Sequence, residues 1–358
     1  MHAKTESPTR APLSIEVCPK EASSDLQTQW NAYVAQHPAA SFYHRYEWAK
    51  LNREQLGNEC HFLVARREGR IAGILPLSLL ASPWFGRILC SMPYVNYGGP
   101  CGDDAEVEDA LTRKAVELTG QVHAKHLELR TKRPSGVQLP VSTRKVSLTL
   151  ALNPDPEALW NGFASKHRTN IRRAQKNNLT VRAGGLELLD VFYAMMEQSW
   201  QHLGTPLYRK AYFKAILETF PDDTRIFVCE QGSEPIAVAF NGYGNGVVEG
   251  MWAGGGPRAR ELQANYVLYW EMMREACLRG SKLYHLGRST ADSGAEDFKK
   301  KWNAESQQLY WYFHRPDGGP MPELNVANPK FQLAIKVWRK LPLWVTRQVG
   351  PVLARSIP

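Results

Sequence analysis

The sequence predicts an α+β (mixed α/β) protein with two tandem domains, each a mixed, mostly antiparallel sheet flanked by helices. Three observations predict it. A hairpin pattern occurs twice, a Gly-Gly-Pro turn follows each copy, and a helical segment and a short strand follow each turn. Because order and spacing are nearly the same in both halves, the sequence indicates a tandem duplication.

The two hairpins are expected at residues 61–77 and 225–242. In each, two apolar runs flank a charged, glycine-containing turn, which is the pattern of a β-hairpin. The apolar positions match at one constant offset, as in Phe62 and Phe227. The sequence therefore predicts the same supersecondary unit in both halves.

The remaining elements follow in order. Gly-Gly-Pro turns occur at residues 98–100 and 255–257, and the strands HLEL and LYHL come later in each half. Asp155 before Pro156 predicts a helix start, because Asp caps free amides and proline suits the first turn. The aromatic stripe of QANYVLYWEMMREACLRG predicts a helix face in the core. We expect a flexible N-terminus at 1–14, a first domain at 15–150, a second domain with the active site at 151–315, and a basic amphipathic tail at 316–358.

Composition narrows the class of protein. The net charge of +9 favours anionic partners, although many proteins with this charge bind none. The six cysteines form no CxxC pair, which argues against a zinc site or a disulfide framework, so no metal is expected.

The two ends of the chain bear on location. The N-terminus has no signal-peptide core, which predicts a cytoplasmic protein. The tail alternates apolar and cationic residues, and it either packs on the protein's own core or touches the inner membrane surface.

One predicted helix is strongly basic. Arg168, Arg172 and Lys176 recur every four residues, with Arg173 beside them. Like charges at this spacing repel, so the pattern favours either a solvated face or a phosphate-bearing donor. Sequence-specific DNA binding is not expected, because no helix-turn-helix or zinc signature occurs.

Seven motifs occur together: YVNYGGP, KHRTNIRRAQKNNL, YRKAYFKAI, FN, NYVLYW, GRS and FKKKW. In this order they resemble the FemAB-like family of tandem GNAT-type acyltransferases, and most closely the subgroup associated with exosortase/PEP-CTERM and exopolysaccharide systems. The resemblance covers residues 15 to 315. It implies transfer of an acyl or aminoacyl group to an amine, and the best-understood members use aminoacyl-tRNA to extend peptidoglycan stem peptides.

The resemblance also implies site residues. It places Lys299 of the FK motif at the active centre, facing the donor phosphate or the developing oxyanion, with Arg288 nearby. From its place on or near the second hairpin, Glu249 is either a proton relay facing the cleft or an ordinary strand glutamate pointing at solvent. The sequence departs from the subgroup at His285, Asp292 and Asn303; His285 is expected to be an ordinary core histidine. Substrate-binding candidates are Tyr208, Arg209, Tyr212, Asn241, Asn265 and Ser289.

Three functional hypotheses follow. The first is an N-acyl or aminoacyl transferase that acts by direct attack on an amine of a lipid-linked or polysaccharide envelope precursor. It needs no certain cofactor beyond an activated donor, either aminoacyl-tRNA or acyl-CoA. The second is a CoA-dependent N-acetyltransferase acting on an amino sugar; the pyrophosphate loop of such enzymes is degraded here, because the glycines of AGGGPRAR precede the arginines. The third is a non-catalytic scaffold that binds anionic envelope precursors.

Overall fold

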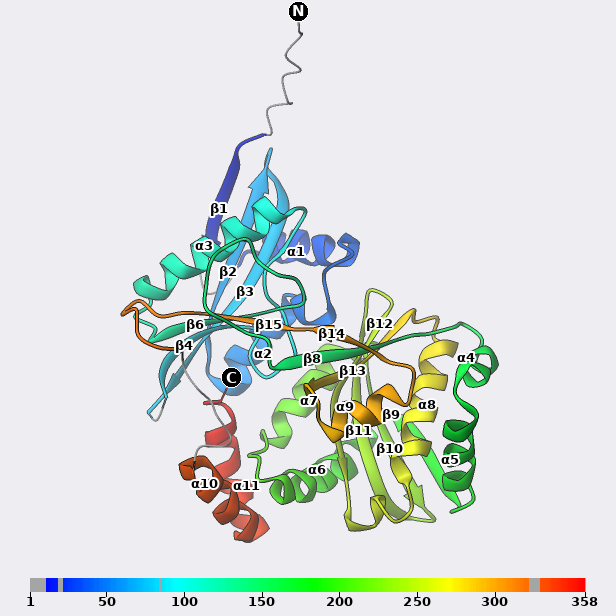
Figure 1. Cartoon of the computed structure of the whole chain (residues 1–358). Coiled ribbons are helices and arrows are strands. Elements are labelled where there is room, and N and C mark those ends of the chain that lie inside the picture. Colours follow the sequence, from blue (N-terminus) through cyan, green and yellow to red (C-terminus); the bar gives the residue numbers. More distant parts are fainter. Residues whose placement is uncertain (1–10, 19–21, 84, 322–328, 358) are drawn as a thin grey trace, which may run out of the picture.

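The computed structural model describes residues 11–18, 22–83, 85–321 and 329–357. It contains two mixed sheets flanked by helices, which confirms the predicted α+β architecture (Figure 1). The expected N-terminal segment lies largely outside the described residues, and the boundaries of the two domains stay a prediction.

The first sheet has the order β1-β2-β3-β4-β6-β15-β7, with β5 beside β3, and the second has the order β14-β8-β13-β12-β11-β10-β9. The strands of the first sheet are β1 (Leu13–Cys18), β2 (Glu59–Arg67), β3 (Arg70–Ser82), β4 (Gly86–Ser91), β5 (Cys101–Gly102), β6 (His126–Thr131), β7 (Val141–Ser142) and β15 (Tyr310–His314). Those of the second are β8 (Lys145–Ala151), β9 (Leu179–Gly184), β10 (Thr224–Gln231), β11 (Glu234–Gly244), β12 (Val247–Gly255), β13 (Leu283–Thr290) and β14 (Glu305–Gln308).

The helices cover these sheets and the junction between them. They are α1 (Ser24–Gln36), α2 (Glu47–Leu56), α3 (Ala105–Gln121), α4 (Pro156–Gly162), α5 (Ser165–Gln175), α6 (Leu189–Leu203), α7 (Lys210–Thr219), α8 (Ala264–Leu278), α9 (Gly294–Lys300), α10 (Pro329–Lys340) and α11 (Leu343–Ala354). Three short 3₁₀ turns are η1 (Phe42–His44), η2 (Leu186–Leu188) and η3 (Pro257–Ala259).

Both sheets repeat one plan. The predicted hairpins are β2-β3 and β10-β11, each paired antiparallel. Each sheet then contains a parallel pair, β4 with β6 and β12 with β13, which are the strands expected around the Gly-Gly-Pro turns and helices. The repeated order predicted from the sequence is therefore present in the fold.

The two sheets also exchange strands across the chain. β15, near the end of the second half, pairs with β6 of the first sheet, while β14 immediately before it pairs with β8 of the second. Figure 1 shows this orange segment crossing from one sheet to the other. The chain thus ties the halves together by main-chain hydrogen bonds.

A shared core fills the junction of the halves. Phe42 and Trp48 from the first half pack against Phe220 from the second, at ring-centroid distances of 4.9 and 5.4 Å. Arg45 closes the edge of this contact with an ion pair to Asp223 at 2.5 Å. Because closely packed buried rings lose contacts when one half moves against the other, these contacts stabilise one arrangement of the two sheets.

Local signals place the helices as predicted. The Asp155 side chain accepts a hydrogen bond from the amide of Glu157, and Pro156 is the first residue of α4. The stripe on α8 faces the core, where Trp270, Met273 and Cys277 are buried.

The short helix α9 is held by Trp302, which is fully buried. Its ring lies 4.3 Å from the ring of His167 and 5.9 Å from that of Tyr269, which it stacks upon. Phe298 packs on the other side, 6.3 Å from Trp302. Since α9 has only seven residues, these contacts rather than helix propensity fix its position.

We predict that Trp302→Ala lowers the free energy of unfolding by about 3–5 kcal/mol, because it leaves a cavity among these rings. Urea denaturation followed by circular dichroism measures it. The matched control is Trp344→Ala, since Trp344 is 70% exposed and its loss should change stability by about 0.5 kcal/mol or less. Equal effects of the two substitutions would contradict this role of Trp302.

Candidate active site between two parting strands

A cavity opens where β12 and β13 separate. The two strands pair in parallel only at residues 247–249 with 283–285, and the cavity of about 350 Å³ lies beyond that point. Gly250 stands at the point where β12 and β13 separate, which we call the fork. A Cβ atom on Gly250 would lie 2.9 Å from the carbonyl oxygen of His285. A larger residue would push the strands apart at their last point of contact.

Several further parts of the chain complete the walls of the cavity. They are β11, α9, the segment after β4, α6, the α6–α7 connection, α8 and the end of α11, so both halves of the chain contribute. The polar and aromatic lining residues from the last five of these are Tyr94, Asn96, Trp200, Thr205, Tyr208 and Tyr269.

Lys299 reaches this cavity from α9. Its Nζ donates hydrogen bonds to the carbonyl oxygens of Gly287 at 3.0 Å and Arg288 at 2.9 Å. Gly287 has φ +75°, a left-handed conformation that favours glycine. Burial, together with the nearby charge of Arg288, lowers the pKa of Lys299 to about 8. A protonated lysine has three N–H donors, so one remains for a ligand.

Arg288 adds a second cation to the same wall. Burial and the neighbouring charge of Arg130 lower its pKa to about 10. Its Nη1 atom is buried without a hydrogen-bond partner, and its guanidinium lies 5.3 Å from the ring of Trp311. Among the described residues, no carboxylate forms an ion pair with it. By contrast, Arg130 donates to the buried carboxylate of Glu128 at 2.7 Å.

Asn241 provides a third donor. It lines the cavity from β11, and its Nδ2 atom is buried without a partner. The cavity therefore gathers an unpaired amide, an unpaired guanidinium N–H and the spare N–H of Lys299. Such donors are costly to bury unless an acceptor, and for the cations an anion, completes them.

A polar triad lies at the base of the fork. Tyr97 donates its hydroxyl proton to Glu249 at 2.5 Å and also contacts Nδ1 of His285. The second carboxylate oxygen of Glu249 is 3.4 Å from that nitrogen. Burial alone would raise the pKa of Glu249, but His285, Lys132 and the Tyr97 hydroxyl together hold it below its usual value.

Tyr97 is the member of this triad that sequence reasoning missed as a site residue. It lies in the YVNYGGP motif, so the motif is the signal that could have found it. His285 is buried with polar partners, which agrees with the expectation of a core histidine. Glu249 itself does not line the large cavity; its neighbour Gly250 does, while Tyr97 lines a second cavity of about 220 Å³ in the first half.

The structure does not bring the other predicted residues into the cavity. Arg209 and Asn265 are exposed, the latter as the second residue of α8, whose cap position is Gln263. Tyr212 is buried and donates to Asn52 at 3.2 Å. Ser289 is buried on β13 with no partner for its hydroxyl group.

The basic helix α5 lies outside the cavity as well. Arg168 donates to the carbonyl oxygen of Asn161 at 3.0 Å, and Arg172 lies 5.4 Å from the ring of Trp160. Arg173 and Lys176 are exposed. These cations form a surface feature of the second half, and their role in phosphate binding stays a prediction.

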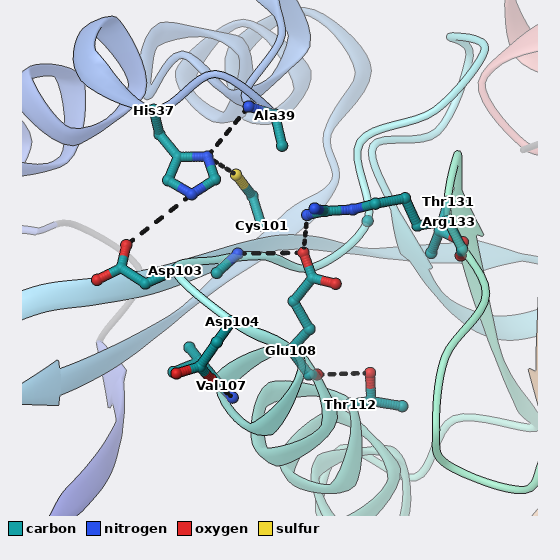
Figure 2. Close-up of polar contacts among 12 residues, drawn as sticks. His37, Ala39, Cys101, Asp103, Asp104, Val107, Glu108, Thr112, Thr131 and Arg133 are labelled. Carbon is teal, nitrogen blue, oxygen red and sulfur yellow. Dashed lines mark hydrogen bonds and ion pairs between the residues drawn. The ribbon is translucent and has the colours of Figure 1, made fainter. Parts of the chain in front are cut away.

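The first half contains a cysteine and a histidine in contact (Figure 2). Sγ of Cys101 is 3.2 Å from Nδ1 of His37, whose Nε2 is 3.9 Å from Asp103. This order of groups is that of an activated thiol. Burial, however, raises the pKa of Cys101 to about 12, so the thiol stays protonated at neutral pH. The burial of this thiol therefore argues against a nucleophilic role.

We predict an unusual pH dependence of stability from Lys299. Its pKa is about 8 in the folded chain against an ordinary 10.5, so the unfolded state holds more protons between these values. The free energy of unfolding of the wild type should therefore rise with pH through this window relative to Lys299→Met, which cannot titrate. Urea denaturation of both proteins at pH 7.5 and 10 tests it. Parallel pH profiles would show that Lys299 has an ordinary pKa.

Two family models match the central part of the chain. The FemAB family model matches residues 92–231, and the model of the GNAT acetyltransferase domain matches residues 165–300. No curated protein sequence matches the chain.

Solved structures share the fold of most of the chain. The crystal structure of FemX has a TM-score of 0.61 at 15% identity, with 84% of this chain and 97% of that chain covered. The C-terminal domain (DUF2156) of a protein named as a lysylphosphatidylglycerol synthetase, from Agrobacterium fabrum, has a TM-score of 0.56 at 12% identity, covering 82% and 93%. A tandem GNAT protein from the clavulanic acid biosynthesis pathway has a TM-score of 0.52 at 13% identity, covering 86% and 100%. The chain therefore has the tandem GNAT fold, and it is similar to the FemAB family over residues 92–231 and to the GNAT acetyltransferase domain over residues 165–300.

Proposed function

We propose that this protein is an acyltransferase that moves an acyl or aminoacyl group onto an amine in the cavity between β12 and β13. The observation that carries the proposal is the set of three donors in that cavity: Lys299, Arg288 and Asn241. The two cations there have no carboxylate partner among the described residues, which suits a ligand with an anionic or developing anionic oxygen.

The reaction needs little covalent help from the protein. The acceptor amine attacks the carbonyl carbon of an ester or thioester, a C–N bond forms, and the C–O or C–S bond breaks. The proton lost by the amine balances the one gained by the leaving oxygen or sulfur. In this proposal Lys299 and Arg288 stabilise the negative oxygen, while the cavity walls hold the reactants in line.

Glu249 is the proposed proton relay. Its carboxylate is ionised at neutral pH, because its pKa lies below the usual value, and it adjoins the lining residue Gly250. Tyr97 and His285 orient it through their contacts with its two oxygens. A carboxylate held in this way can take a proton from the acceptor amine through a water molecule.

The substrate class is proposed from the family likeness. The acceptor is an amine of a cell-envelope or exopolysaccharide precursor, either lipid-linked or a polysaccharide, in an exosortase/PEP-CTERM setting at the cytoplasmic side of the inner membrane. The donor bears phosphates, as aminoacyl-tRNA does, and the α5 cations Arg168, Arg172, Arg173 and Lys176 supply contacts for it outside the cavity. Tyr208 lines the cavity and is the proposed acceptor contact, with Arg209 exposed one residue further along.

A CoA-dependent sugar N-acetyltransferase is the second candidate. Helix α8 lines the cavity with Tyr269 and Met272, and free amides at the start of a helix suit a pyrophosphate. However, η3 and five further residues separate β12 from α8, and Gln263 at the N-cap position of α8 has a left-handed conformation with φ 55°. This departure from a short glycine-rich loop favours a donor other than CoA.

Ligand-dependent thermal shift tests the donor. A ligand at about 100 times its Kd adds ~2.7 kcal/mol to the free energy of unfolding. We expect a charged tRNA pool to stabilise the wild type and to stabilise Lys299→Ala less, while the control Lys301→Ala, an exposed neighbour, keeps the wild-type shift. A shift with acetyl-CoA or CoA instead would favour the sugar acetyltransferase. Binding without any product in mass spectrometry, and insensitive to Lys299→Ala, would favour a scaffold.

We also predict that Glu249→Gln reduces turnover about 100-fold with little change in donor affinity, because it removes the relay and leaves the donor contacts. Single-turnover assays with the donor identified above measure it. Tyr97→Phe should give a smaller loss, since Glu249 keeps its contact with His285. Unchanged turnover in both variants would exclude Glu249 from the reaction.

A further inference from the structure

The helical hairpin of α10 and α11 has a charge pattern unlike the rest of the chain. Residues 329–358 contain six Lys or Arg and no Asp or Glu. In Figure 1 the two red helices lie together at one end of the molecule beside α6. Both helices contact α6, so the hairpin has an inner face and an outer face.

The inner face is already packed. Trp338 is buried, and Ile335 lies against Gly204 at the end of α6. Arg347 forms an ion pair with Glu197 of α6 at 2.7 Å. The tail is therefore docked on the protein, which was one of the two alternatives left open by its sequence.

The outer face nevertheless remains apolar. Leu333 and Val337 stand four residues apart on α10, and they are 64% and 51% exposed. Trp344, at the start of α11, is 70% exposed, and Val349 and Val352 follow it on the same helix. Exposed apolar side chains grouped on adjoining helices are typical of an interaction surface.

Cations flank these apolar residues. Lys336 and Lys340 stand beside Leu333 and Val337 on α10, and Arg339 is exposed nearby. A protein partner for such a surface would have to supply acidic and apolar groups together. An anionic bilayer supplies both everywhere, and tryptophan is favoured at its interface. Among the described residues, no helix combines the length and apolarity needed to cross a bilayer, so a contact here would be peripheral.

We propose that the outer face of the α10–α11 hairpin docks on an anionic lipid surface, with Leu333, Val337 and Trp344 inserted at the interface and Lys336 and Lys340 among the headgroups. The docking proposal does not depend on the proposed reaction, because it is argued from this surface alone.

The hairpin also forms part of the candidate active site. Ala354 and Ile357 line the cavity, and the carbonyl oxygen of Arg355 accepts a hydrogen bond from Tyr94 at 2.8 Å. The docked hairpin would therefore hold one wall of the cavity near the lipid.

Sedimentation with vesicles tests the proposal. The full-length protein is mixed with vesicles of phosphatidylcholine alone, or with vesicles that also contain about 30% of the anionic lipid phosphatidylglycerol. We expect binding to the anionic vesicles, weakening as salt rises. Trp344→Ser with Val337→Ser, and separately Lys336→Glu with Lys340→Glu, should each reduce partitioning about tenfold or more.

Matched controls remove the same groups elsewhere. Leu278→Ser removes an exposed apolar residue from α8, and Arg70→Glu with Arg113→Glu makes the same change of charge in the first half. These controls should bind as the wild type does, and thermal unfolding checks that every variant folds. Equal binding by the controls and the hairpin variants would overturn the proposal, as would absence of binding to anionic vesicles. Dimerisation in sedimentation velocity that the hairpin variants abolish, without vesicle binding, would assign the surface to a second copy of the chain.

Discussion

The separation of β12 and β13 is the constraint on which the rest of the site depends. Two parallel strands that stay paired would satisfy each other's main chains and leave no room between them. Here the pairing stops after three residue pairs, at Glu249 and His285, and the next residues, 250–253 of β12 and 286–288 of β13, line the cavity. Gly250 permits the last close approach, and Gly287 turns its carbonyl oxygen toward Lys299. The fork therefore sets both the location of the cavity and the direction of its main donor.

Arg130, which is buried, and Arg288, which is half-buried, show how the same residue type serves opposite purposes. Arg130 is fully neutralised by Glu128 and packs over Trp311 at 4.4 Å, so it stabilises the folded chain without needing a ligand. Arg288 packs on the same ring but has no carboxylate partner among the described residues, and burial lowers its pKa. A cation left in this condition raises the free energy of the empty protein. In the proposed function, an anionic group that enters the cavity would offset this cost.

Sequence patterns predicted the elements whose signals are local. The hairpins, the Asp155 cap and the core face of α8 all depend on residues within one or two turns, and the structure confirms them. The pairing of β15 with β6 could not be predicted, because it joins residues from Tyr310–Thr131 (310 − 131 = 179 positions apart) to His314–Leu127 (314 − 127 = 187), and nothing in YWYFH specifies its partner strand. Lys299 and Arg288 were found through family motifs, whereas the triad was not, since Tyr97 and His285 meet only after the two halves pack.

The strand exchange has a consequence for synthesis. During translation the first sheet cannot be completed when its own half has emerged, because β15 is made only after nearly all of the second half. Until then β6 presents an unpaired edge, which is a site for wrong pairing. In a nascent chain that edge therefore stays open to wrong pairing until the segment that ends at His314 has been made. The duplicated halves are alike in plan, but they cannot mature one after the other.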